Sequence, residues 1–314
     1  MYVTRLDPTF KDYVWGGNKL KEIYGKKTDY NKTAESWELS CHKDGLSFIC
    51  DGKLKGKTLL SALEIWGIDA LGKKAASFNF FPILIKLIDA NDRLSVQVHP
   101  NDEYALKEEG QYGKTEMWYV IDAEPDAQLV YGLKRSLTKK EFLQNASDGS
   151  LTDDLNYVSV KKGDVFFIEA GLIHAIGKGI LIAEIQQNSN LTYRVYDYGR
   201  KDSMGNTRVL HTEKASDVAK LDATVFQKTE PVIEKIGDAE LSKLCSCPYF
   251  TVHKTILDGS YEILTDDSFI SLTVTEGEGT VASLPVKAGA TVFIPAGIKK
   301  TQINGKMTFL TATV

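Results

Sequence analysis

Hydrophobic and polar residues alternate with a period of two along much of this chain. Over Ala34–Cys41, Trp37 and Leu39 alternate with polar neighbours, which is typical of a strand with one buried face. The almost entirely apolar run Phe80–Ile88 predicts a buried strand, although Lys86 interrupts it. Further strands are predicted over Glu116–Ile121, Gln128–Tyr131, Tyr157–Val160, Val165–Glu169, Ile180–Gln187 and Thr192–Tyr196.

Helical spacing of apolar residues is found in a few short segments of the first half. Thr58–Trp66 and Asn101–Glu109 both predict helices. Thr138–Ala146 begins with a capping box, in which the Thr138 hydroxyl and the Glu141 carboxylate satisfy each other's backbone N–H groups. These segments predict isolated helices inserted among strands.

The second half of the chain is organised differently. A polar, mixed segment from about residue 200 to 238 predicts a connection between domains. Beyond Tyr249, short strands alternate with Gly, Asp and Pro turns, with almost no helix signal. The fold is therefore expected to be mainly β, built as sandwiches or barrels, with a few short helices in the N-terminal half.

An internal repeat sharpens this expectation. Residues 163–177 and residues 289–303 share Gly, Phe, Ile, Ala and Gly at matching offsets. Both copies describe a strand closed by glycine-dependent turns, which places the residue three positions after the second Gly at the mouth of a barrel. That residue is His174 in the first copy and Lys300 in the second, and a charged lysine cannot bind a metal ion.

The repeat resembles the second motif of the cupin superfamily, Gly-x5-Pro-x-Gly-x2-His, with Glu169 in the place of Pro. The first cupin motif, His-x-His followed by Glu, corresponds here to Gln97-x-His99 followed by Glu116. The resemblance implies two cupin (jelly-roll) barrels. Residues 1–238 would form the metal-binding catalytic domain with helical insertions and the connecting segment. Residues 239–314 would form a smaller, degenerate cupin domain that buries one sheet face of the first.

Composition narrows the classes of function. The 314 residues are 43% hydrophobic and 25% charged, with a net charge of −4, which is ordinary for a soluble protein and argues against nucleic acid as a partner. No apolar run reaches the length of a membrane span, and the first residues lack the apolar core of a signal peptide. Cys41 and Cys50 are isolated, and Cys245 and Cys247 form a C-x-C too tight for an ordinary disulfide. Reduced thiols and a cytoplasmic location are therefore favoured. The oligomeric state is not determined by the sequence.

The main candidate chemistry lies in Leu94–Pro100. Gln97 and His99 are two residues apart on a predicted extended segment and so share one face. With Glu116 and His174, they are interpreted as the ligands of one divalent metal ion, and this donor set suits Zn²⁺ or another borderline first-row ion. Taken singly, His99 could instead cap the turn before Pro100, and His174 could be a core histidine.

Three basic residues are candidates for catalysis. Lys86 lies in an apolar run, where a lysine is costly unless it is paired or reaches a rim. Lys114 precedes Glu116 by two positions and so shares its face on an extended segment. Arg194 lies among aromatic residues, where its planar fork could bind a phosphate or an enediolate, or could simply be solvated on an edge strand.

The chain also resembles a specific family, the type I mannose-6-phosphate isomerases in their short bacterial form. The motifs that carry the resemblance are Trp15-Gly16-Gly17, Ala34–Glu38, Leu94–Pro100, Lys114–Tyr119, Gly171–Gly177 and Thr192–Tyr198. The resemblance implies zinc bound at Gln97, His99, Glu116 and His174, and a catalytic arginine at Arg194. Thr115, Asn190 and Gly199 depart from the family pattern without removing a proposed ligand.

The implied reaction interconverts mannose 6-phosphate and fructose 6-phosphate through a cis-enediol. The residues alone leave Lys114, Lys86, a metal-bound water or a nearby carboxylate open as the base. Two other functions are also weighed. One is a different metal-dependent cupin enzyme, such as a dioxygenase, although such enzymes usually have a set of ligands richer in histidine. The other is a non-catalytic sugar-binding cupin.

Overall fold

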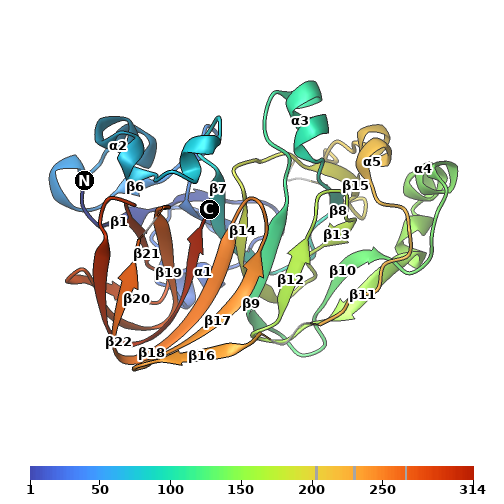
Figure 1. The fold of residues 1–314 in the computed structure, drawn as a ribbon. Coiled ribbons are helices and arrows are strands. Elements are labelled where there is room, and N and C mark those ends of the chain that lie inside the picture. Colours follow the sequence, from blue (N-terminus) through green and yellow to red (C-terminus); the bar gives the residue numbers. More distant parts are fainter. Residues whose placement is uncertain (202–203, 229–230, 266) are drawn as a thin grey trace.

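The computed structural model describes residues 1–201, 204–228, 231–265 and 267–314. In these ranges, antiparallel sheets follow one another along the molecule, and short helices cover one side (Figure 1). The predicted mainly β fold with few short helices is confirmed. Among the described residues, no helix has both the length and the apolar character needed to cross a bilayer.

A central six-stranded sheet joins the two ends of the molecule. Its strands alternate strictly: Ile83, Ile85 and Leu87 contribute to one hydrophobic cluster and Ile88 to another. Both faces of this sheet are therefore buried. In spatial order the strands are β12 (Val165–Ile168), β9 (Glu116–Ala123), β14 (Ile180–Gln187), β7 (Ile83–Ala90), β3 (Glu35–Leu39) and β2 (Thr9–Lys11).

A five-stranded sheet lies against the inner face of the central sheet. The hydrophobic cluster between them includes Trp118 and Ile182 from the central sheet and Leu129 from the five-stranded one. Val96 and Val98 point to the opposite face, where they pack beneath helices. The strands, in order, are β11 (Leu155–Ser159), β10 (Gln128–Leu133), β13 (His174–Ala175), β8 (Val96–Val98) and β15 (Tyr193–Tyr196).

A nine-stranded sheet lies against the outer face of the central sheet. One cluster unites Ile85 and Met117 of the central sheet with Phe293 and Leu310, so the C-terminal region buries one sheet face of the first, as expected. Strands β1 and β6 come from the first fifty residues, so this sheet combines both ends of the sequence. The order is β16 (Ile233–Ile236), β17 (Ala239–Ser246), β18 (Thr251–Leu264), β22 (Lys300–Thr313), β19 (Ile270–Val281), β21 (Thr291–Ile294), β1 (Thr4–Asp7) and β6 (Phe48–Ile49). Strand β20 (Leu284–Lys287) pairs with β19, and β4 (Cys41–His42) pairs with β5 (Gly45–Leu46).

The three predicted helices are confirmed as α2 (Leu59–Trp66), α3 (Asp102–Glu109) and α4 (Lys139–Asp148). Thr58, Asn101 and Thr138 act as N-caps, and the capping box of α4 is present. Two short helices, α1 (Lys19–Glu22) and α5 (Thr212–Val218), were not predicted. The segment from 200 to 238 is therefore more than a connection, because α5 packs onto the five-stranded sheet.

The alternation over Ala34–Cys41 predicted one exposed face, and this prediction is wrong. All five residues of β3 are buried. The Glu38 carboxylate is held by the Lys26 ammonium at 2.5 Å and by the Thr291 hydroxyl at 3.0 Å. Glu38 thus faces the nine-stranded sheet, and not water.

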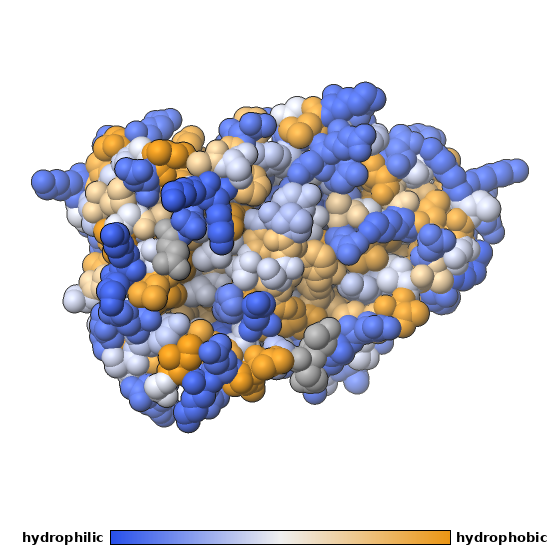
Figure 2. Space-filling view, viewed as in Figure 1, coloured by the Kyte–Doolittle hydropathy of each residue, from blue (hydrophilic) through white to orange (hydrophobic). Residues whose placement is uncertain are grey.

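The outer edge of the nine-stranded sheet is exposed. In the space-filling view, hydrophobic side chains appear in patches among hydrophilic ones on this side of the molecule (Figure 2). Strand β16 forms the edge, and its Ile233 and Ile236 are 64% and 44% exposed. Glu234 and Lys235 lie between them, and such charges on a short edge strand disfavour pairing with another chain.

Candidate metal centre and pocket

Strand alternation places the predicted site residues on one surface. In β8, Val96 and Val98 face the helices, so Gln97 between them faces the central sheet. His174 and Arg194 are both paired with Gln97 across the ladder. Directly opposite residues share a face, so these three side chains form a row on the inner surface of the five-stranded sheet.

The central sheet contributes a facing row. Glu116 lies two residues before Trp118, whose ring belongs to the cluster between the two sheets. Glu184 is paired with Lys86 on one side and with Trp118 on the other. The alternation that buries apolar residues here therefore also directs Lys86, Glu116 and Glu184 inward.

His99, Glu116 and His174 converge. Their closest ligand atoms all lie within 4.8 Å of one another, and all three side chains are buried. His174 Nε2 lies 3.1 Å from His99 Nε2 and 3.5 Å from Glu116 Oε1. The Gln97 amide nitrogen lies 3.3 Å from His174 Nε2. The four predicted ligands are thus brought together at one place.

The surroundings keep His174 neutral and oriented. Its Nδ1 lies 2.8 Å from the Leu172 carbonyl oxygen, a bond that directs Nε2 toward the cluster. The Trp118 ring contacts the imidazole edge-on, with ring centroids 5.4 Å apart. Burial lowers the pKa of His174 to about 4, and a neutral imidazole is the form that binds a metal ion.

The Glu116 carboxylate is only partly paired with protein groups. Its Oε2 lies 2.6 Å from the Lys114 ammonium, but among the described residues its Oε1 accepts no hydrogen bond, although the side chain is fully buried. Buried carboxylates are normally paired or bound to a metal. Two imidazoles, one carboxylate and one amide also match the donor set that zinc prefers. The residues present therefore fit a metal ion.

Lys114 lies closest to this cluster. Its Nζ is 2.6 Å from Glu116 Oε2 and 3.2 Å from His99 Nε2. Glu184 Oε1 is 3.7 Å away. The ammonium is thus in contact with two of the four predicted ligands, and it also lines the adjoining pocket.

Lys86 is not at a rim, because it is 3% exposed. Its Nζ lies 3.1 Å from Glu184 and 3.7 Å from Glu35. Burial alone would lower the pKa of Lys86, but Glu35 and Glu184 outweigh it and raise this pKa. Burial would likewise raise the pKa of Glu184, but Lys114 and Lys86 lower it to about 2. Both groups are therefore charged at neutral pH.

Arg194 extends along the pocket from β15. Its Nη1 donates to the Val209 carbonyl oxygen at 2.8 Å. Within the described ranges, its Nε has no hydrogen-bond partner. Burial, and then the neighbouring Arg208, lower the pKa of Arg194. The guanidinium is thus only partly satisfied by protein groups.

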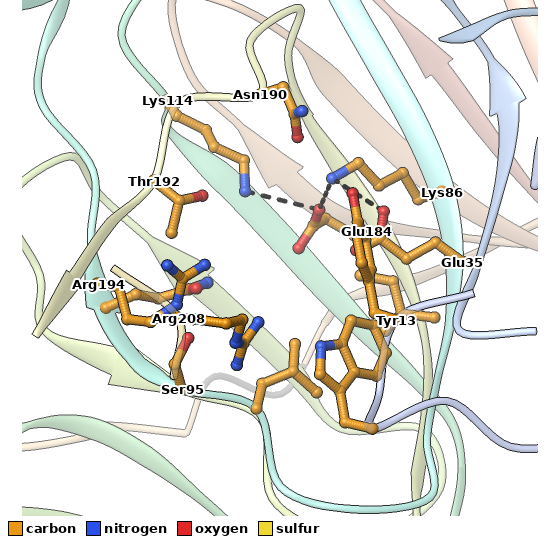
Figure 3. Close-up of a pocket in the computed structure, with 14 residues that line it drawn as sticks. Tyr13, Glu35, Lys86, Ser95, Lys114, Glu184, Asn190, Thr192, Arg194 and Arg208 are labelled. Carbon is orange, nitrogen blue, oxygen red and sulfur yellow. Dashed lines mark ion pairs between the residues drawn. The ribbon is translucent and has the colours of Figure 1, made fainter. Parts of the chain in front are cut away.

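These side chains line one pocket of about 230 Å³ (Figure 3). Four cations and two carboxylates line it: Lys86, Lys114, Arg194, Arg208, Glu35 and Glu184. Gln97 also lines it, so the pocket opens directly onto the four-residue cluster. The arrangement can hold an anionic ligand beside a metal ion.

The sequence interpretation missed Glu184, Arg208 and Tyr13 as pocket residues. Glu184 interrupts an apolar strand in the same way as Lys86, and that signal could have found it. Arg208 lies in the polar segment after β15, where no periodicity marks it. Asn190, which departs from the family pattern, lines the pocket and donates to Asp44 at 2.9 Å.

Comparisons with known proteins agree with this geometry. The family described as phosphomannose isomerase type I, catalytic domain, matches residues 3–128. The family described as mannose-6-phosphate isomerase, cupin domain, matches residues 240–314. Mannose-6-phosphate isomerase ManA of Bacillus subtilis is 39% identical, with 95% of this chain and 94% of that protein covered.

Two further relatives extend this agreement. Probable mannose-6-phosphate isomerase GmuF of Bacillus subtilis is 38% identical, with 97% of each chain covered. A crystal structure of the mannose 6-phosphate isomerase from Bacillus subtilis superposes with a TM-score of 0.92 at 33% identity, covering 100% of both chains. The chain therefore belongs to the type I phosphomannose isomerase family.

Proposed function

We propose that this protein interconverts mannose 6-phosphate and fructose 6-phosphate through a cis-enediol intermediate, with one zinc ion per chain. The observation that carries the proposal is the convergence of His99, Glu116 and His174 beside a pocket lined by four cations. A phosphorylated sugar is anionic, and the intermediate develops further negative charge on oxygen. The pocket supplies positive charge for both.

The proposed ligands of the zinc ion are Gln97, His99, Glu116 and His174, with Gln97 contributing its amide oxygen. Glu116 supports this role, because its buried Oε1 accepts no hydrogen bond among the described residues. A zinc ion bound here would act as a Lewis acid toward the substrate oxygens.

Arg194 is proposed to stabilise the enediolate. It is paired across the ladder with Gln97, so its guanidinium extends beside the proposed ligands. Its Nη1 is held by the Val209 carbonyl oxygen, and its buried Nε donates to no described protein group. A fixed donor directed at developing charge is worth roughly 10²–10³ in turnover.

Lys114 is proposed to move the proton between the two neighbouring carbons of the substrate. Its Nζ is the pocket amine in contact with the proposed ligands, 2.6 Å from Glu116. A general acid or base must lie within hydrogen-bond reach of the substrate. Lys114→Met should therefore abolish incorporation of solvent deuterium at the reacting carbon while zinc content is retained.

Lys86 is proposed to hold charge rather than to carry the proton. The carboxylates of Glu35 and Glu184 raise its pKa, so it remains an ammonium at neutral pH. In that form it fixes both carboxylates at the wall of the pocket. Lys86→Met would leave two buried carboxylates without their cation, and it should lower stability as well as turnover.

The proposed function is tested with the purified full-length protein. After removal of metal by a chelator, zinc should restore conversion of mannose 6-phosphate to fructose 6-phosphate in a coupled assay. Elemental analysis should find one zinc per chain. Absence of conversion by the zinc-loaded protein would contradict the proposal. In that case, oxygen consumption would indicate a dioxygenase, and substrate binding without turnover would indicate a non-catalytic sugar-binding protein.

A further inference from the structure

The pocket has two ends that differ in charge. At one end, Lys86 and Lys114 are matched by Glu35, Glu184 and Glu116. At the other end lie Arg194 and Arg208, next to Ser95 (Figure 3). The positive charge at the lysine end is thus balanced by carboxylates.

At the arginine end, cations outnumber carboxylates. Arg200 and Arg208 both pair with Asp197, each at 2.6 Å. Among the described residues, no carboxylate forms an ion pair with Arg194. Arg200 also lies 3.7 Å from Asp92. Three guanidinium groups therefore face two carboxylates here, which leaves an excess of one positive charge. A phosphate monoester carries about −1.5 to −2 charges at neutral pH.

Arg208 is built to present a rigid cation. Its Nε donates to Asp197 Oδ2 at 2.8 Å, and its Nη2 donates to Asp197 Oδ1 at 2.6 Å. Asp197 itself is 5% exposed. A guanidinium has five N–H groups in a planar fork, so this two-point pairing fixes its plane and leaves further donors for a ligand.

We propose that Arg208 binds the phosphate group of the substrate and thereby makes the pocket selective for phosphorylated over free hexoses. This inference rests on the proposed function. The phosphate is at the far end of the carbon chain from the reacting carbons, so it must lie away from the proposed zinc ligands. Arg194 is assigned to the other role, because it is paired with Gln97 and its Nη1 is held by the Val209 carbonyl.

Arg208 and Arg194 are also linked through the backbone. The carbonyl oxygen that orients Arg194 belongs to Val209, the residue that follows Arg208. A phosphate held by Arg208 would therefore be fixed relative to the arginine that faces the reacting carbons. This linkage is the type of positioning that brings reacting groups into a productive geometry.

The test compares Arg208→Gln and Arg208→Lys with the unmodified protein. Hydrogen bonds to a charged group are worth about 1.5–3 kcal/mol, so KM for mannose 6-phosphate should rise about 10- to 150-fold in Arg208→Gln. Its kcat should be nearly unchanged, and competitive inhibition by inorganic phosphate should weaken by the same factor. Arg208→Lys keeps the charge but loses the fork, so its KM should fall between the two.

Arg5→Gln is the matched control. Arg5 pairs with Asp51 through the same two contacts, at 3.1 Å from Nε and 2.7 Å from Nη2, but outside this pocket. This variant loses a bidentate ion pair of the same geometry, and its KM for mannose 6-phosphate and its inhibition by phosphate should not change. A rise in KM for both variants would mean that any lost Arg–Asp pair has this effect, and it would overturn the inference.

Two other results would also overturn it. In one, Arg208→Gln leaves KM and phosphate inhibition unchanged. In the other, it lowers kcat at constant KM, which would place Arg208 at the reacting carbons. If the unmodified protein does not isomerise mannose 6-phosphate, the proposed function fails. Stabilisation by inorganic phosphate against thermal unfolding, compared between Arg208 and Arg208→Gln proteins, then still tests the anion site.

Discussion

The two copies of the internal repeat begin with similar backbone geometry, but the residues at their matching positions differ in burial. Strand β12 in the first copy and β21 in the second follow glycines with φ of +89° and +86°. After β12, the chain carries His174 into the interior, where it is fully buried. After β21, the corresponding Lys300 is 67% exposed and pairs with Glu262 at 2.9 Å.

The interiors differ in the same way. The inner space of the C-terminal region is filled by apolar side chains, among them Val274, Ile303 and Phe309. The inner space of the N-terminal region contains buried charges, among them Lys86 and Glu184. Burying a charge costs free energy unless it is paired, whereas burying apolar surface contributes stability. The N-terminal region thus has buried charges where apolar side chains would be more stabilising. The C-terminal region covers one face of the central sheet and stabilises the N-terminal region by apolar packing.

The largest effect on turnover should come from substituting the residue at which the two repeats differ, His174 in the first and Lys300 in the second. His174→Ala removes a proposed zinc ligand, and it should lower turnover of mannose 6-phosphate by at least about 10³, at the upper end of the loss seen for single preorganised groups. Lys300→Ala, at the matching position, should leave turnover unchanged. Steady-state kinetics and elemental analysis of zinc measure both. Similar losses in the two variants would show that the repeats do not differ in function.

The next largest effect should be a loss of turnover with no change in metal binding. Arg194→Ala should lower kcat by roughly 10²–10³ because a fixed donor to the developing charge is lost. Its zinc content should remain that of the unmodified protein. Arg135→Ala is the control, since Arg135 pairs with Asp154 on the exposed side of α4 and lies outside the pocket. Loss of zinc from Arg194→Ala would instead make Arg194 a support for the metal ligands.

A third prediction tests the contact between the two regions. The Thr291 hydroxyl in the second repeat donates to the buried Glu38 carboxylate at 3.0 Å. Thr291→Val should lower the free energy of unfolding by about 1.5–3 kcal/mol, the usual value for a hydrogen bond to a charged group. Thr273→Val removes a hydroxyl that lies 3.0 Å from the Thr291 hydroxyl, and it should cost about 0.5–1.5 kcal/mol. Denaturant unfolding measures both, and equal costs would mean that Glu38 gains nothing from Thr291.

Local signals in the sequence predicted much of the fold. The helices begin at Thr58, Asn101 and Thr138, because these side chains satisfy backbone N–H groups whatever the tertiary structure. Strand alternation likewise predicted that Gln97 and His99 share a face. The convergence of His99, Glu116 and His174 was inferred from motif spacing, and the structure brings the three together.

The remaining features depend on long-range pairing, which a single sequence does not encode locally. Glu184 neutralises Lys86 because β14 and β7 are in a particular register. Arg208 lines the pocket and pairs with Asp197, and no periodic pattern in the sequence marks its position. The burial of Glu38 depends on Lys26 and Thr291, which are remote from it in different directions along the chain.

The smallest expected effect tests whether packing in the C-terminal interior influences the pocket in the N-terminal region. Ile303 and Ile182 are both fully buried, the first in the C-terminal interior and the second beside the pocket region. Each Ile→Val change should lower the free energy of unfolding by about 0.5–1.5 kcal/mol. Only Ile182→Val should also change KM or kcat, because Glu184 is the next inward residue on its strand. If Ile303→Val changes turnover equally, the C-terminal region transmits its packing to the site, and its role would extend beyond covering the central sheet.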